Sequence, residues 1–246
     1  MFERLIRWVR NILRAGTDGI TTNIQLSGEM ESAISRWARI YEGCPDWCPK
    51  GTHSLRLASS IASEFARLVT LEMAVNIEGS ARAEYLGTQI EPFLERIRSY
   101  TELGCALGNM VFKPYVADNR ILIDAVQGDC FLPIAFDSSF RMTDVVFVEQ
   151  QIAGRQIYTR LERHKFEDGT DTITNRAFQS ESNQSLGREI LLTDVASWSS
   201  IAPEAKISGI EKPLFAHFKV PITNRVDRHS PLGTSVFAEA VDTLRD

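Results

Sequence analysis

The sequence predicts an α+β fold, with helices in the first part of the chain and strands in the second. Up to residue 108, apolar residues recur every three or four positions, as on one face of a helix. Beyond it, short β-branched and aromatic runs are separated by turn residues such as Asp118-Asn119. Helices followed by strands, rather than alternating with them, favour α+β over α/β. We expect a helical region at 1–108, a mainly antiparallel sheet region at 109–227, and the start of a helix in 228–246.

Three helices are expected between the N-terminal segment and the sheet region. The first begins after Ser27, whose hydroxyl suits an N-cap. The second follows Ser54 and is apolar on nearly every side, which predicts a helix buried in the core. Its apolar residues are Ala58, Ile61, Ala62, Phe65, Leu68, Val69, Leu71, Met73 and Ala74. The third spans 86–103 and should kink or restart at Pro92, because proline removes a backbone donor.

The sheet region is expected to contain short strands and a long meander. Three runs predict strands at 109–116, 121–126 and 130–136. The meander covers 145–178, with turns at Ala153-Gly154 and Asp168-Gly169. In its middle strand, one face carries Ile157, Thr159 and Leu161, and the other carries Tyr158, Arg160, Glu162 and His164. We expect the second face to be in contact with water. A further strand is expected in PLFAHFKVPITN, closed by Pro221.

Both ends of the chain predict amphipathic helices. The first 14 residues place arginines at positions 4, 7, 10 and 14, with apolar residues between them. Near the other end, Ser230 suits an N-cap and Pro231 the first helical position, and no capping residue follows before Asp246. We therefore expect that helix to continue in a longer polypeptide. The assembly contacts that we predict on these two helices are Phe2, Leu5, Trp8, Val9, Val236, Phe237, Val241 and Leu244.

Each terminal helix has an alternative interpretation. The C-terminal apolar stripe could pack on the core of its own chain. The arginine-rich N-terminal helix could lie on a membrane surface, as in an adaptor protein, or dock on another protein surface. No apolar run approaches the roughly 18 residues that span a bilayer.

Charge and motifs give little support to catalysis or cofactor binding. The formal net charge is −5, which does not suit a protein that grips nucleic-acid phosphates over a broad surface. Lys50-Gly51-Thr52 lacks the order of a phosphate-binding loop. Cys44, Cys48 and His53 lack a fourth zinc ligand, and the four cysteines are too few and too scattered for a disulfide framework. We expect no cofactor, no metal and no enzymatic activity.

One enzymatic alternative is a metal-dependent hydrolase. Asp124, Asp129 and Asp137 follow or interrupt predicted strands and could gather around a divalent ion. Aspartate is also common in turns because its side chain bonds the nearby backbone. His164, His217 and His229 occur in no catalytic spacing.

Eight segments resemble, in order and spacing, the portal proteins of tailed double-stranded DNA bacteriophages, in particular those of long-tailed phages with Gram-positive hosts. The segments are AISRWARIYEG, SLRLASSIASEFARLVTLEM, LGCALGNMVFKPYV, GDCFLPIAFD, VVFVEQ, YTRLERH, PLFAHFKVPITN and SPLGTSVFAEAVD. They extend over nearly the whole chain. The resemblance covers roughly the N-terminal half of such proteins, which forms the outer wing, and the last segment would lead toward the stem.

The resemblance implies a structural role at one vertex of a capsid. Portal proteins form a dodecameric ring through which double-stranded DNA is packaged and ejected, and which connects head and tail. The implied partners are copies of the same chain, the terminase, the scaffold or major capsid protein, and the head-completion protein, with no membrane. The implied locations are the virion and, during assembly, the host cytoplasm.

Overall fold

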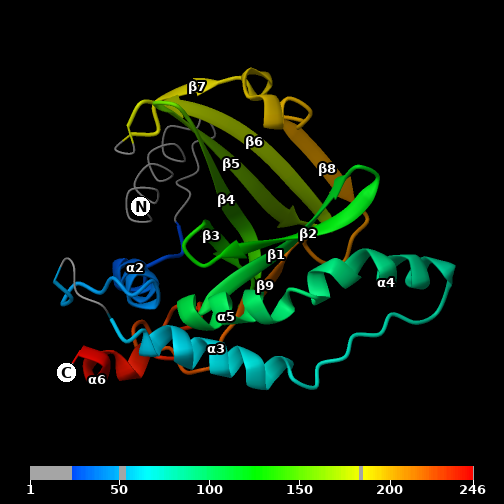
Figure 1. Cartoon of the computed structure of the whole chain (residues 1–246). Helices are drawn as coiled ribbons and strands as arrows, with labels where there is room; N and C mark the ends of the chain where they lie inside the picture. The colour runs from blue at the N-terminus through cyan, green and yellow to red at the C-terminus, as the bar shows by residue number, and fades with distance from the viewer. Residues whose placement is uncertain (1–23, 50–53, 183–184, 246) are drawn as a thin grey trace. The chain divides into compact units, whose positions relative to one another are not determined.

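The computed structural model describes residues 24–49, 54–182 and 185–245 (Figure 1). Helices and antiparallel sheets are both present, which confirms the predicted α+β class. The chain forms two compact units, and each unit is built from two stretches of sequence. Among the described residues, the first unit comprises those within 24–31 and 130–214, and the second comprises those within 32–129 and 215–245. This division differs from the predicted one, because the strands before Cys130 belong with the helices.

The helices confirm several predicted boundaries. They are α2 (Gly28–Tyr41), α3 (Leu57–Thr70), α4 (Ala81–Leu94), α5 (Ile97–Leu107) and α6 (Val241–Arg245). At the start of α2, the Ser27 hydroxyl accepts a hydrogen bond from the Met30 N–H at 3.3 Å, as expected of an N-cap. The predicted third helix divides into α4 and α5 shortly after Pro92, so the restart is also confirmed.

The second unit contains a three-stranded antiparallel sheet of order β2-β1-β9. Its strands are β1 (Asn109–Ala117), β2 (Arg120–Gln127) and β9 (Ala216–Lys219). Asp118 and Asn119 turn the chain between β1 and β2 with positive φ angles of 49° and 58°. These two residue types tolerate the left-handed region better than most, so the predicted turn forms as the sequence indicates.

The predicted helix beginning at Pro231 is wrong. Residues 230–237 are not helical; a 3-10 turn, η3 (Ala238–Ala240), precedes the short α6. The Asn109 side chain donates to the Gly233 carbonyl and accepts from the Gly233 N–H, both at 2.9 Å. The Val236 N–H donates to the Cys105 carbonyl at 3.0 Å. A helix starting at Pro231 would need the Gly233 carbonyl and the Val236 N–H for its own hydrogen bonds, so their use elsewhere holds the segment in a non-helical form.

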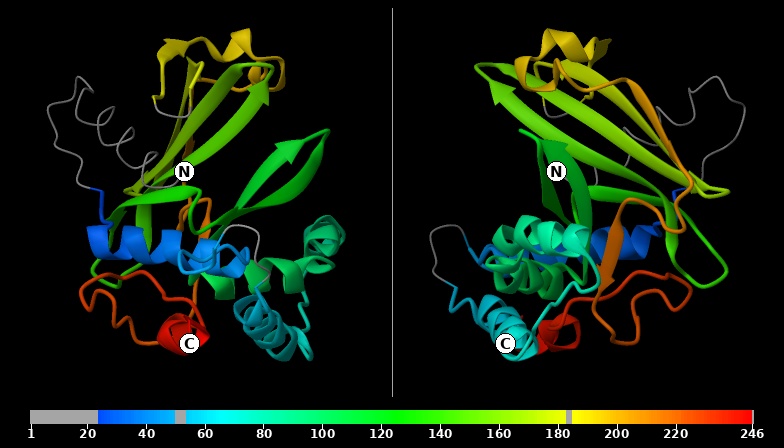
Figure 2. Two further views of the ribbon diagram at one scale, coloured as in Figure 1. Left: turned by 60° about the vertical axis from the view of Figure 1, so that its left-hand side comes forward. Right: turned by 90° about the vertical axis from the view of Figure 1, so that its right-hand side faces the viewer.

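The first unit contains a six-stranded antiparallel sheet. Its main order is β3-β4-β5-β6-β7, and β8 also pairs with β6. The strands are β3 (Phe131–Phe136), β4 (Met142–Ala153), β5 (Gln156–Glu167), β6 (Thr170–Ser180), β7 (Arg188–Ile190) and β8 (Glu204–Ser208). The meander β4-β5-β6 is confirmed. Its second turn lies at Asp168-Gly169 as predicted, and its first lies at Gly154-Arg155, one residue later than predicted, with Gly154 and Gly169 at φ 63° and 70°. Figure 2 shows that this sheet is twisted.

The prediction that the second face of β5 is in contact with water is wrong. Glu162 and His164 on that face are 9% and 2% exposed. The segment after β7 folds over the face and forms an apolar cluster above it. The cluster consists of Ala177, Leu192, Val195 and Trp198, with Tyr158, Ile190 and Ile201 packed against it. Both faces of the central strand therefore contribute buried residues.

Candidate assembly surface

The helix α3 in the second unit exposes its large apolar side chains. The buried residues of α3 are all small: Ala58, Ala62 and Ala66. The helix packs against α5. In the same helix, Phe65, Leu68 and Val69 are 44%, 56% and 60% exposed. The prediction of a helix buried in the core is therefore wrong, because alanines make the internal contact and leave the bulkier residues outside.

The chain that follows α3 continues this exposed surface. Leu71, Met73, Val75 and Ile77 are 64%, 43%, 45% and 39% exposed. They alternate with polar or small residues, as in a strand, although this connection to α4 pairs with no strand of the described chain (Figure 1). Between positions 74 and 79, the backbone makes no hydrogen bond with any of the described residues. The connection thus offers both apolar side chains and open backbone groups.

We call these exposed residues the outer strip. It consists of Phe65, Leu68, Val69, Leu71, Met73, Val75 and Ile77. Scattered apolar residues on a protein surface need no explanation, but a run of this length in one connected stretch of chain is typical of interaction sites. The outer strip is the feature of the described chain that best fits a contact with another molecule.

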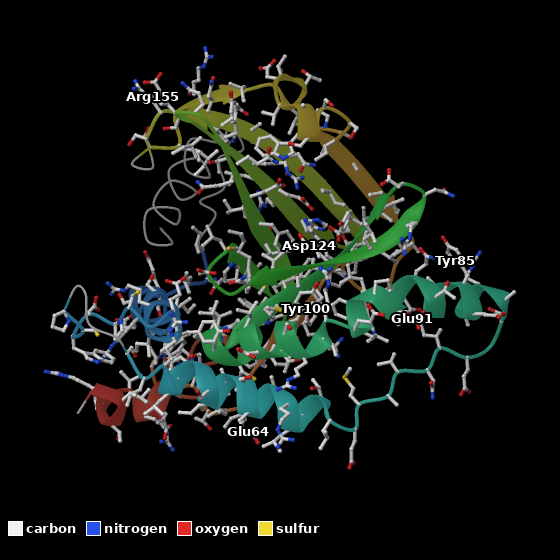
Figure 3. All side chains as sticks on the ribbon, in the orientation of Figure 1. Glu64, Tyr85, Glu91, Tyr100, Asp124 and Arg155 are labelled. Carbon is white, nitrogen blue, oxygen red and sulfur yellow. The ribbon has the colours of Figure 1, made fainter. Side chains whose placement is uncertain are left out.

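The charged residues along the outer strip are mostly acidic. Glu64 on α3 forms an exposed ion pair with Arg67 at 2.7 Å, and this hydrogen bond lowers the pKa of the Glu64 carboxyl (Figure 3). Glu72 and Glu78 are exposed and form no ion pair with any other described residue. No lysine or arginine lies between positions 68 and 79. The strip therefore combines apolar side chains with uncompensated negative charge.

The eight predicted assembly contacts have different outcomes. Phe2, Leu5, Trp8 and Val9 lie outside the described residues. Phe237 and Val241 are 1% and 5% exposed, so they belong to the interior of the second unit, in agreement with the alternative that this stripe packs on its own core. Val236 and Leu244 are partly exposed, and Leu244 lines a hollow together with Trp47, Leu55 and Leu57. The sequence did not single out the outer strip as a contact surface.

The candidate metal ligands do not converge in the part of the chain that the structure describes. Among those residues, no three His, Cys, Asp or Glu side chains are placed to hold an ion. Asp137 accepts hydrogen bonds from the backbone N–H groups of Ser139 and Arg141, which is the turn role expected of aspartate. Asp124 lies opposite Lys113 in the β1-β2 ladder (Figure 3). His53 lies outside the described residues.

A buried charge network in the first unit was not predicted. His164 lies between two carboxylates, with Nε2 at 2.9 Å from Glu162 Oε1 and Nδ1 at 3.3 Å from Asp171 Oδ2. Asp171 Oδ2 also accepts from the Leu214 N–H at 2.8 Å, and Arg160 pairs with Glu162 at 2.8 Å. The Asp171 side chain is fully buried, and its Oδ1 has no hydrogen-bond partner among the described residues.

The network raises the pKa of His164. Burial lowers that pKa, but the hydrogen bonds to Asp171 and Glu162 outweigh burial and favour the protonated imidazole. Both ring nitrogens of a protonated imidazole are donors, so His164 can donate one hydrogen bond to Asp171 and one to Glu162. Because the imidazole is 2% exposed, we assign the network a structural role.

Comparison with protein-family models and with curated protein sequences finds no match to this chain. Among the described residues, no helix has the length and apolar character needed to cross a bilayer.

Proposed function

We propose that this chain is the wing portion of a phage portal protein, a structural subunit of a ring at the capsid vertex without enzymatic activity. The observation that carries the proposal is the outer strip. A subunit of a closed assembly needs a surface that another molecule covers, and the apolar residues of α3 and its following connection provide one. The ordered resemblance of eight segments to portal proteins supplies the identity of the assembly.

A ring requires heterologous contacts, in which one surface of each subunit meets a different surface of the next. The outer strip suits this geometry because its acidic character makes self-pairing unfavourable. Two copies that met strip to strip would bring Glu72 and Glu78 of each copy close to the same residues of the other. A different surface, apolar and basic, would complement it.

The proposed partners and the proposed passage of DNA come from the resemblance to portal proteins. The ring would conduct double-stranded DNA, bind the terminase during packaging, and later hold the head-completion protein. A net charge of −5 suits a conduit, because few phosphate contacts would form to retain the DNA.

Self-association of the purified chain tests the assembly role. Amine cross-linking across a concentration series should produce a ladder of dimers, trimers and higher species, because heterologous contacts do not stop at two subunits. Replacing Leu68 and Val69 by glutamine should remove the ladder. Replacing Ile152, an apolar residue that is 72% exposed in the first unit, should leave it unchanged. A chain that remains monomeric at every concentration, or stops at dimers, would contradict the proposal.

A further inference from the structure

We infer that the outer strip is the docking site for residues 2–14 of a second copy of this chain. The inference rests on the proposed function, because it assumes that copies of the chain contact one another. Residues 2–14 lie outside the described residues, and their sequence indicates how they could bind.

The segment 2–14 matches the outer strip in apolar character and in length. The sequence of 2–14 predicts a helix with apolar residues on its surface, among them Leu5, Val9 and Ile12. Such a helix would be about 20 Å long, close to the length of the 14-residue α3. The exposed residues of α3 lie one turn apart, as Phe65, Leu68 and Val69, which is the spacing that a second helix can pack against.

The segment 2–14 and the outer strip carry opposite charges. The segment 2–14 contains four arginines and only one acidic residue, Glu3. The outer strip carries Glu72 and Glu78, which have no ion-pair partner among the described residues. Arg4 and Arg14 would be about 15 Å apart along a helix. Glu72 and Glu78 are at most about 20 Å apart along an extended chain, so both carboxylates could pair with arginines at once.

The segment 2–14 and the outer strip are two different surfaces of one chain. The segment 2–14 is apolar and basic, and the outer strip is apolar and acidic. The segment of one copy can therefore bind the strip of another. When each copy gives its segment to the next and receives another on its own strip, the contact is heterologous and can repeat around a ring. A second copy is therefore the occupant that the proposed function favours.

Site-specific photo-cross-linking of the full chain tests this contact. Trp8 is replaced by the photoreactive residue p-benzoylphenylalanine, and the protein is prepared both unlabelled and labelled with ¹⁵N. The two preparations are mixed at high concentration and irradiated, and the linked peptides are identified by mass spectrometry. We expect position 8 to link to peptides that contain residues 65–78, in pairs that join labelled to unlabelled chains.

Charge reversal distinguishes a lost contact from misfolding, because a second reversal should restore the cross-links only if the two charged surfaces meet. Replacing Glu72 and Glu78 by lysine should lower the yield of these links by about three- to tenfold. Adding Arg4→Glu and Arg14→Glu in the same chain should restore the yield, because opposite charges again face each other. The control is Glu42→Lys, an exposed position of the second unit outside the strip, which should leave the yield unchanged.

Three outcomes would overturn the inference. Links from position 8 that fall outside 65–78, or no links at all, would show that the strip has another occupant. Links found only within single chains would show that each chain covers its own strip. Loss of the links in the presence of anionic lipid vesicles, with the protein bound to them, would show that the segment prefers a membrane surface. In each case, a persisting ladder of oligomers would leave the portal proposal standing.

Discussion

Replacing His164 by glutamine should destabilise the first unit strongly. The substitution removes a buried cation that lies 2.9 Å from Glu162 and 3.3 Å from Asp171. Glu162 would keep Arg160 as a partner, but Asp171 would keep only the Leu214 N–H. Removing one member of a buried ion pair costs about 3–5 kcal/mol, because the remaining charge is left uncompensated. At about 2–4 °C per kcal/mol for a chain of this size, the melting temperature should fall by about 6–20 °C.

The same network predicts how stability depends on pH. The pKa of His164 is raised in the folded state, whereas in the unfolded chain it is about 6.5. The stabilising contribution is therefore complete below about pH 6.5 and is lost as the pH rises through the folded-state pKa. One proton limits the slope to about 1.4 kcal/mol per pH unit. In the His164→Gln variant, this decrease above pH 6.5 should be absent.

Urea unfolding followed by far-UV circular dichroism, at about pH 6 and about pH 8.5, measures both effects. Hydrogen exchange of the β5 and β6 amides would assign the loss to the first unit. The exposed His229 provides the control, since His229→Gln should change the free energy of unfolding by less than about 0.5 kcal/mol. A loss below about 1 kcal/mol for His164→Gln, or an unchanged pH slope, would refute the reasoning.

Two further predictions concern the second unit. Gly233→Ala should lower the free energy of unfolding by about 1–3 kcal/mol, because the new Cβ would lie 2.3 Å from the Gly108 carbonyl oxygen. Gly87→Ala, inside α4 with no atom within 4 Å of the new Cβ, should raise it by about 0.5–1 kcal/mol, and thermal unfolding of both variants distinguishes the two signs. Burial, with a smaller effect of the Lys219 charge, lowers the pKa of His217 to about 4. Stability should therefore decrease as the pH falls from about 6.5 to about 4, and a His217→Gln variant should show a smaller decrease in acid urea titrations.

The meander could be predicted because its signals are local. Two-residue turns at Gly154 and Gly169 join long runs of strand-forming residues, and each turn sets the register of the strands that it connects. The helix predicted at Pro231 failed for the opposite reason. Its capping signals are also local, but they compete with Asn109, a residue 124 positions away that bonds the backbone of Gly233. A local pattern does not reveal such a partner.

The outer strip and the buried network show a second limit of sequence patterns. An apolar residue predicts burial only when the fold brings another surface to cover it, and α3 meets α5 through alanines. Likewise, alternation in β5 assigns Glu162 and His164 to one face, but it does not show that the segment around Trp198 covers this face. For α3 and β5, the sequence pattern predicted the type of element correctly. The burial of their side chains depended on which distant elements cover them.

The unpaired connection after α3 has a consequence for how the protein behaves before it finds any partner. An extended segment with alternating apolar residues can stack with identical segments of other chains into a cross-β arrangement, at about 4.8 Å between neighbours. Glu72 and Glu78 stand near the two ends of this stretch, so in-register stacking would align like charges along the fibril axis. The two carboxylates therefore act as gatekeepers that oppose aggregation while the stretch is uncovered.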